Sequence, residues 1–335
     1  MQGYKTSDGS YVLPDGTHIC EGEYSVIKIL GIGASSIVYL IQENRSQNMM
    51  ALKVFNKDYD RFRDIETDIL NQLRDVKGVV RCLEKVTLEN GMCAFVMPYY
   101  ENGTLDVYLK TMSERGLNYN EHYFVYLLYT FSTIVFDYVR DGVCQCDLKP
   151  TNFLMRDDDV PVIADFGLAQ KLPIGCFSSK TPDEIYTSWY KPPNNTSFQK
   201  SFTFSLPTEM WALLVSSLHL ASITRRSETP ESSEYYYRFL GCPMFQVFRQ
   251  SDYDLPNSQI KIDNAVDSVF KEKKFSDFFK KWLNIVRMKD LMASFNEDSF
   301  ETYIREFRSD IQVVLEISGD DGSAGRAGRA GRADH

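Results

Sequence analysis

The hydrophobic pattern of the chain changes near residue 102, and this change constrains the fold more than any other feature. From Tyr24 to Met97, short apolar runs of strand length alternate with turns, and one interval from Arg63 to Leu73 has helical spacing. After Asn102-Gly103 the apolar residues recur mainly with the period of a helix. The pattern predicts an α+β protein with a β-rich first part that contains one main helix, and a mostly helical second part.

The same pattern places the individual elements. Strands are expected at 26–30, 37–41, 49–55, 79–80 and 93–97. Helices are expected at 63–73, 105–111, 121–139, 207–221, 275–286 and 300–315, with a polar loop at 225–234. In the N-terminal extension, residues 1–23, a hairpin is expected between 11–13 and 17–19 around Pro14-Asp15-Gly16. Residues 318–335 are rich in Gly and Arg and lack large apolar side chains, so we expect them to be disordered.

Composition narrows the class of protein. The chain has 335 residues, is 43% hydrophobic and carries a net charge of -9, so it is poorly suited to bind nucleic acid or an anionic membrane through bulk charge. The most apolar run, 123–139, is shorter than the roughly 20 residues that cross a bilayer. The start lacks a signal-peptide pattern and the seven cysteines form no Cys-x-x-Cys pair. We expect a soluble intracellular protein, cytoplasmic or nuclear, with reduced thiols.

A glycine-containing turn and a lysine in the first part suggest a phosphate site. Gly31-Ile-Gly33-Ala-Ser-Ser36 joins two expected strands, where backbone N–H groups can fold over phosphates without obstruction by Cβ atoms. Such a turn alone is more often only a turn. Lys53, on the strand after Ala51, adds a cation. Glu66 lies on the core side of the expected helix, where a carboxylate needs a partner, and Lys53 is the natural one.

The second part carries a matching group of polar residues. Asp147, Lys149 and Asn152 lie on one short loop, and Asp165 ends the apolar run 162–164. Asp147 can accept the proton of an incoming hydroxyl, and Lys149 can neutralise charge on a phosphoryl group in transfer. Asn152 and Asp165 are oxygen ligands that suit Mg²⁺. Together they indicate phosphoryl transfer from a nucleotide to a hydroxyl.

The order and spacing of these motifs resemble the eukaryotic protein kinase family from about residue 24 to residue 315. The resemblance implies a bilobal protein-kinase-like fold: an N-lobe at 24–97, a hinge at 98–102 and a C-lobe at 103–317. It implies ATP and Mg²⁺, with Mn²⁺ as an alternative ion, and a protein substrate, with neither a membrane nor a specific nucleic acid as partner.

The resemblance also assigns residues to the nucleotide and to the substrate. ATP would contact the glycine-containing turn, the hydrophobic walls around adenine, the back of the pocket and the hinge: Leu30, Gly31, Gly33, Ser36, Val38, Ala51, Lys53, Met97, Pro98, Tyr100 and Leu154. Lys149, two residues after Asp147, resembles serine/threonine rather than tyrosine kinases. Thr187 matches the family threonine that bonds the catalytic Asp and Lys beside the substrate.

Four departures from the family pattern bear on activity and regulation. Ser36 occupies the position of a third loop glycine, and Gln145-Cys146 occupies that of His-Arg. Asn194 replaces a glutamate, and Glu209 replaces an aspartate that anchors the catalytic loop. The family arginine holds a phosphate on the activation segment, so Cys146 predicts activity that is independent of phosphorylation there. The alternatives are a pseudokinase that serves as an ATP-binding or scaffold module and, third, a small-molecule kinase.

Overall fold

The computed structural model describes residues 4–5, 11–33, 35–56, 60–89, 91–117, 119–156, 160–181, 190, 201–224, 258–287 and 296–317. The chain divides into two compact units. The first contains Met1–Glu101 and Ala164–Gly167, and the second contains Asn102–Ile163 and Leu168–His335. Each unit is described by itself.

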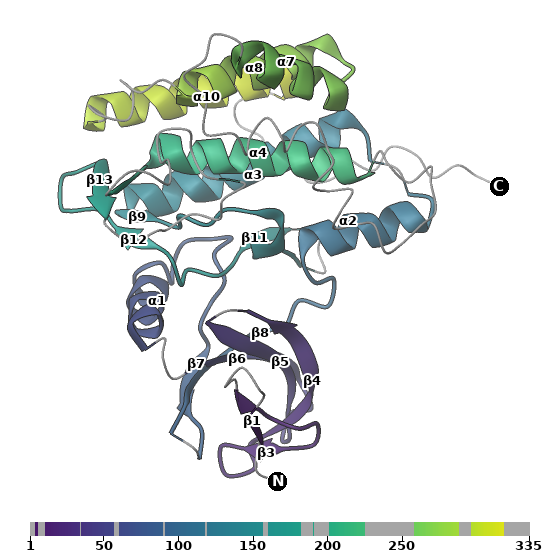
Figure 1. Ribbon diagram of the computed structural model, residues 1–335, viewed down its shortest axis with the longest axis vertical. Helices are drawn as coiled ribbons and strands as arrows, with labels where there is room; N and C mark the ends of the chain where they lie inside the picture. Colours follow the sequence, from purple (N-terminus) through teal and green to yellow (C-terminus); the bar gives the residue numbers. More distant parts are fainter. Residues whose placement is uncertain are drawn as a thin grey trace. The chain divides into compact units, whose positions relative to one another are not determined.

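The first unit is built on a curled antiparallel sheet of order β3-β4-β5-β6-β8-β7 (Figure 1). Its strands are β3 (His18–Ile19), β4 (Tyr24–Ile32), β5 (Ser36–Glu43), β6 (Met49–Phe55), β7 (Glu84–Thr87) and β8 (Cys93–Pro98). Val26, Ile41 and Leu52 lie in the core of the sheet. The hydroxyl of Tyr24 donates to Glu84 Oε2 at 2.9 Å, which joins β4 to the last strand of the sheet.

One described helix, α1 (Asp60–Gln72), accompanies this sheet. Ile69, Leu70 and the following Leu73 are buried, as the helical spacing predicts. Glu66 is 1% exposed, so the helix buries a carboxylate among these apolar residues. A buried charge requires a partner, and for Glu66 that partner is Lys53 of β6.

Two sequence predictions for the first unit are wrong. The hairpin between 11–13 and 17–19 does not form: β2 (Tyr11–Val12) pairs with β1 (Tyr4–Lys5), and β3 pairs with β4. The turn itself exists, with Gly16 at φ 77°, but Gly16 N–H donates to Val26 O and so directs the chain to β4. Residues 79–80 belong to no named strand, and the edge strand is the charged β7 instead.

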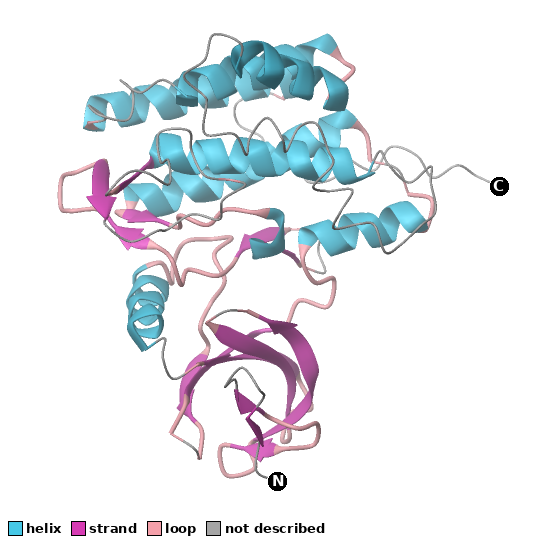
Figure 2. Cartoon of the chain, in the orientation of Figure 1, coloured by secondary structure: helices cyan, strands magenta, loops and turns pink. Residues whose placement is uncertain are grey.

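The second unit is mainly helical, as Figure 2 shows by colour. Its described helices are α2 (Leu105–Glu114), α3 (Glu121–Arg140), α4 (Leu206–Thr224), α7 (Ser258–Val269), α8 (Lys273–Arg287) and α10 (Glu297–Leu315). α4 packs against α2, α3, α7 and α8, which explains why nearly all of its residues are buried (Figure 1). Side chains of Asn120 and Asn296 cap the N-termini of α3 and α10.

Short strand pairs hold the loops of this unit. β9 (Val143–Cys144) pairs with β12 (Gln170–Lys171), and β10 (Phe153–Met155) pairs with β11 (Pro161–Ile163). β13 (Ser178–Thr181) pairs with β14 (Phe202–Ser205). The sequence pattern predicted neither α7 nor the pair β13–β14.

Several sequence predictions lie outside the described residues: Thr187, Asn194, the loop at 225–234 and the tail at 318–335. Among the helices of the described ranges, none combines the length and the apolar character needed to cross a membrane.

Candidate functional site

Lys53 lies buried in the first unit between two carboxylates. It is on β6, opposite Val38 of β5 and Phe95 of β8, and is 5% exposed. Its Nζ lies 2.7 Å from Glu66 Oε2 and 2.9 Å from Asp165 Oδ1. Burial alone would lower the pKa of Lys53, but the two carboxylates outweigh it and hold that pKa above its usual value. Lys53 therefore stays charged.

The backbone conformation around Asp165 lets its carboxylate lie close to Lys53. Asp165 has φ 59°, in the left-handed region, and its side chain is 47% exposed. Glu66 also accepts a backbone hydrogen bond from Phe166. A Cβ atom at Gly167 would lie 3.4 Å from Asp165 Oδ1, so a glycine leaves the carboxylate room. Asp165 thus meets Lys53 with one oxygen while part of the carboxylate faces solvent.

The glycine-containing turn connects β4 to β5 at the closed end of their hairpin. Gly31 pairs with Val38, and Gly33 N–H donates to Ser36 O at 2.8 Å. Gly31 and Gly33 are exposed, and a Cβ at Gly31 would meet no atom within 4 Å, whereas Ser36 is buried. The turn is therefore an exposed backbone surface, as a phosphate-covering loop requires.

The remaining residues expected around a nucleotide base are distributed over both units. Ala51 pairs with Met97 across β6 and β8, and Pro98 ends β8. Val38, Met97, Pro98 and Tyr100 are half-buried, and Leu30 is 40% exposed. In the second unit, half-buried Leu154 lies on β10 and bridges to Thr104.

In the second unit, one loop brings Asp147, Lys149 and Asn152 together. Lys149 Nζ lies 2.6 Å from Asp147 Oδ2. Asn152 Nδ2 donates to Asp147 O at 2.9 Å and to Asp147 Oδ2 at 3.2 Å. Asp147 is 6% exposed, so the lysine and the amide hold a nearly buried carboxylate in one orientation. The sequence predicted these three residues as one group, and the loop places them in contact.

The anchor of this loop is Glu209 on α4. Glu209 Oε2 accepts from Gln145 N at 3.0 Å and from the Tyr138 hydroxyl at 2.5 Å, and Oε1 accepts from Cys146 N at 2.9 Å. Burial raises the pKa of Glu209 to about 7, although all three hydrogen bonds act to lower it. The longer side chain therefore reaches the loop backbone that the family aspartate is expected to hold.

Two of these supporting side chains were missed by sequence reasoning. Tyr138 lies within an apolar helix and carried no signal of a polar partner. Gln145 was noted as a departure, but its side-chain oxygen accepts from Asp147 N at 2.8 Å. Cys146 has φ 65° and is 1% exposed, with its Sγ directed to Cys144 O at 3.4 Å. A buried thiol cannot replace the arginine that binds a phosphate.

The expected magnesium ligands differ in their surroundings. Both hydrogen bonds named above for Asn152 use its Nδ2, so the carbonyl oxygen remains the natural metal ligand. The half-exposed carboxylate of Asp165 supplies the charged oxygen. Across the described ranges, no three His, Cys, Asp or Glu side chains cluster to hold a metal by themselves. The donor set fits Mg²⁺ that arrives with substrate phosphates and keeps water ligands.

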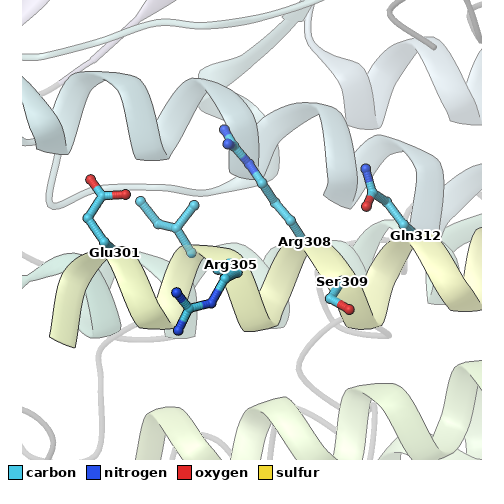
Figure 3. Close-up of a pocket in the computed structure, with 6 residues that line it drawn as sticks. Glu301, Arg305, Arg308, Ser309 and Gln312 are labelled. Atoms are coloured by element: carbon cyan, nitrogen blue, oxygen red, sulfur yellow. The ribbon is translucent and has the colours of Figure 1, made fainter. Parts of the chain in front are cut away.

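A surface pocket of about 410 Å³ lies on α10, and none of the residues named above lines it (Figure 3). It is lined by Glu301, Ile304, Arg305, Arg308, Ser309 and Gln312. Arg308 lies over the ring of Phe136 at 5.5 Å, and Glu301 pairs with Arg140 at 3.1 Å. These contacts fasten α10 to α3, so we assign the pocket no part of the site.

Comparison with known proteins agrees with this geometry. Residues 24–294 match the model of the protein kinase domain, and the chain belongs to this family with its bilobal α+β fold. Serine/threonine-protein kinase MAK of Mus musculus is 26% identical over 239 residues, 69% of this chain and 36% of that protein. Serine/threonine-protein kinase Nek10 of Mus musculus is 27% identical over 207 residues, 57% of this chain and 18% of that protein. The chain thus spans only part of the length of the relatives it matches.

Proposed function

We propose that this chain is a protein kinase that transfers the γ-phosphoryl group of Mg-ATP to serine or threonine hydroxyls of proteins. The observation that carries the proposal is the state of Asp147, a nearly buried carboxylate held by Lys149 and Asn152. An acceptor for a hydroxyl proton must be oriented, and these contacts hold the carboxylate in place beside a cation. The relatives named serine/threonine-protein kinases and the position of Lys149 favour serine and threonine over tyrosine.

In this proposal the two units contribute different functions. In the first, Lys53 binds phosphate oxygens with its orientation fixed by Glu66, and Asp165 holds the metal. In the second, Asp147 accepts the hydroxyl proton, Lys149 neutralises charge on the transferred group, and Asn152 adds a metal ligand. Bound Mg²⁺ supplies neutralisation of the phosphate charge. Thr187 is proposed to position the protein substrate.

The residues proposed to contact ATP are those that the family resemblance assigns. They are Leu30, Gly31, Gly33, Ser36, Val38, Ala51, Met97, Pro98, Tyr100 and Leu154, together with Lys53. Pro98 lacks an N–H but keeps a carbonyl acceptor for the adenine edge, and the donor would be Tyr100 N–H.

A pseudokinase is the second interpretation, and the hydrogen bonds of the loop weigh against it. Three family departures, Gln145, Cys146 and Glu209, occur together in one network that ends on Asp147. A scaffold has no use for an oriented acceptor at this position. The network therefore supports a loop that has kept its catalytic task with altered residues.

Phosphoryl transfer from radiolabelled ATP to a generic protein substrate, with Mg²⁺, tests the proposal. Asp147→Asn removes the proton acceptor and is expected to lower the rate at least about a hundredfold. Asp141→Asn, at an exposed aspartate after α3, is the matched control and should retain wild-type activity. Equal incorporation by Asp147→Asn and wild type would refute the role of Asp147. Absence of transfer by wild type would favour the pseudokinase, and transfer to metabolites alone would favour a small-molecule kinase.

A further inference from the structure

Gln145 connects both sides of a strained turn in the loop that carries Asp147. Its backbone N–H donates to Glu209 Oε2 at 3.0 Å, and its side-chain Oε1 accepts from Asp147 N–H at 2.8 Å. The side chain is fully buried. One residue is thus bound to the helix α4 by its backbone and to Asp147 by its amide oxygen.

Cys146, the residue that Gln145 spans, has a backbone conformation that requires support. Its φ of 65° lies in the left-handed region, which non-glycine residues rarely adopt. Glu209 Oε1 holds Cys146 N at 2.9 Å, and the bond from Gln145 to Asp147 closes the turn on the other side. Such strain persists only where the surroundings fix it. The amide oxygen of Gln145 is therefore part of what sets the direction in which Asp147 leaves the turn.

We propose that Gln145 is a positioning residue for Asp147, whose amide oxygen fixes the turn that aims the Asp147 carboxylate. The inference rests on the proposed function where it concerns catalysis. Gln145, which departs from the family pattern, would then stabilise the loop by its own side chain. Its loss should disturb Asp147 while leaving the nucleotide-binding residues of the first unit unchanged.

The first measurement follows hydrogen exchange of the Asp147 amide and needs no activity. Gln145→Met keeps the length of the side chain and removes the acceptor. Exchange at Asp147 is expected to become about tenfold faster. Gln170→Leu is the matched control, because its side chain donates to Leu168 O. Wild-type exchange in Gln145→Met would overturn the proposal.

The second measurement separates positioning from general loss of structure. In phosphoryl transfer, Gln145→Met should lower kcat about tenfold and leave KM for ATP within about twofold. A rise in KM with unchanged kcat, or an equal loss in Gln170→Leu, would contradict the proposal. If wild type transfers no phosphoryl group, the proposed function fails, and exchange alone decides whether Gln145 holds Asp147. If Gln145→Met does not fold, Gln145→Leu takes its place.

Discussion

The carboxylate of Glu209 lies 3.0 Å from the backbone nitrogen of Gln145, across 64 residues of sequence. This bond ties the loop of Asp147 to α4, a helix whose described residues are nearly all buried. The Tyr138 hydroxyl shares the same oxygen of Glu209, so α3 joins the anchor. The orientation of Asp147 therefore depends on a buried polar network with members from two helices and the loop, and changes in that network are measurable.

Removing the hydroxyl of Tyr138 tests the α3 branch. Tyr138→Phe is expected to lower the free energy of unfolding by about 2 kcal/mol, because it removes a hydrogen bond to a buried carboxylate. Urea denaturation measures the change. Tyr126→Phe, the same substitution at a half-buried position of α3, should change stability by less than about 0.5 kcal/mol. Equal effects of both variants would exclude a specific bond to Glu209.

Glu209 should give stability a distinctive pH dependence. Burial raises its pKa to about 7 from 4.5, so between these values the folded protein binds the proton more tightly. Stability from this group therefore falls as pH rises from about 4.5 to about 7, by up to about 3 kcal/mol. Glu209→Gln should lack this component when unfolding is followed across the window.

Buried His219 changes the pH dependence of stability in the opposite direction, so its contribution must be separated from that of Glu209. Burial lowers the pKa of His219 to about 3, so its contribution rises with pH between about 3 and 6.5. It is present in both proteins and cancels in the difference between wild type and Glu209→Gln. A difference that stays constant from pH 4.5 to pH 7 would show that folding does not raise the pKa of Glu209.

The buried ion pair of Lys53 predicts a large and asymmetric effect. Lys53→Met leaves Glu66 without its cation and is expected to cost about 3 kcal/mol of unfolding free energy at pH 8. The cost should shrink at pH 5, because Glu66 can then take up a proton. The double variant with Glu66→Leu should recover most of the loss. Lys28→Met, at an exposed lysine of β4, is the control and should be near neutral. An unchanged stability in Lys53→Met would contradict the pair.

Phosphatase treatment should leave phosphoryl transfer within about twofold of the untreated rate, because the arginine that reads a phosphate is replaced by buried Cys146. Ser178, Ser179 and Thr181 lie in β13, which the ladder with β14 already orders, and Thr181 is buried. The triple alanine variant of these three residues should likewise keep its activity. A loss of more than about tenfold in either case would restore conventional control by phosphorylation.

Much of the fold could be predicted from the sequence, because the regular spacing of apolar residues in long strands and helices does not depend on how these elements pack together. The strands β4, β5, β6 and β8 and the helices α1, α3 and α8 were anticipated for this reason. The pairing of short strands was not: β3 has two residues, and its partner is decided by the hydrogen bond from Gly16 to Val26. β7 has only four residues, of which Glu84 and Lys85 are charged, so its composition gives only a weak strand signal.

For the site, the order of the motifs was enough to predict six polar residues: Lys53, Glu66, Asp147, Lys149, Asn152 and Asp165. The observed contact agrees with the predicted pairing of Lys53 with Glu66. The supporting bonds could not be predicted. The contact of Tyr138 with Glu209 joins residues 71 apart, and no local pattern reports it. The bond from Gln145 to Asp147 depends on the positive φ of Cys146, a conformation that its residue type disfavours.

The two carboxylates that flank Lys53 come from very different places in the chain, 13 and 112 residues away. A nascent chain emerges N-terminus first, so Glu66 can reach the lysine soon after α1 has left the ribosome. Asp165 follows only after Asn102–Ile163 of the other unit have been made. The first unit therefore becomes complete only after residues 102–163 of the second unit have been synthesised. A chain that stops before residue 164 would hold Lys53 against Glu66 alone.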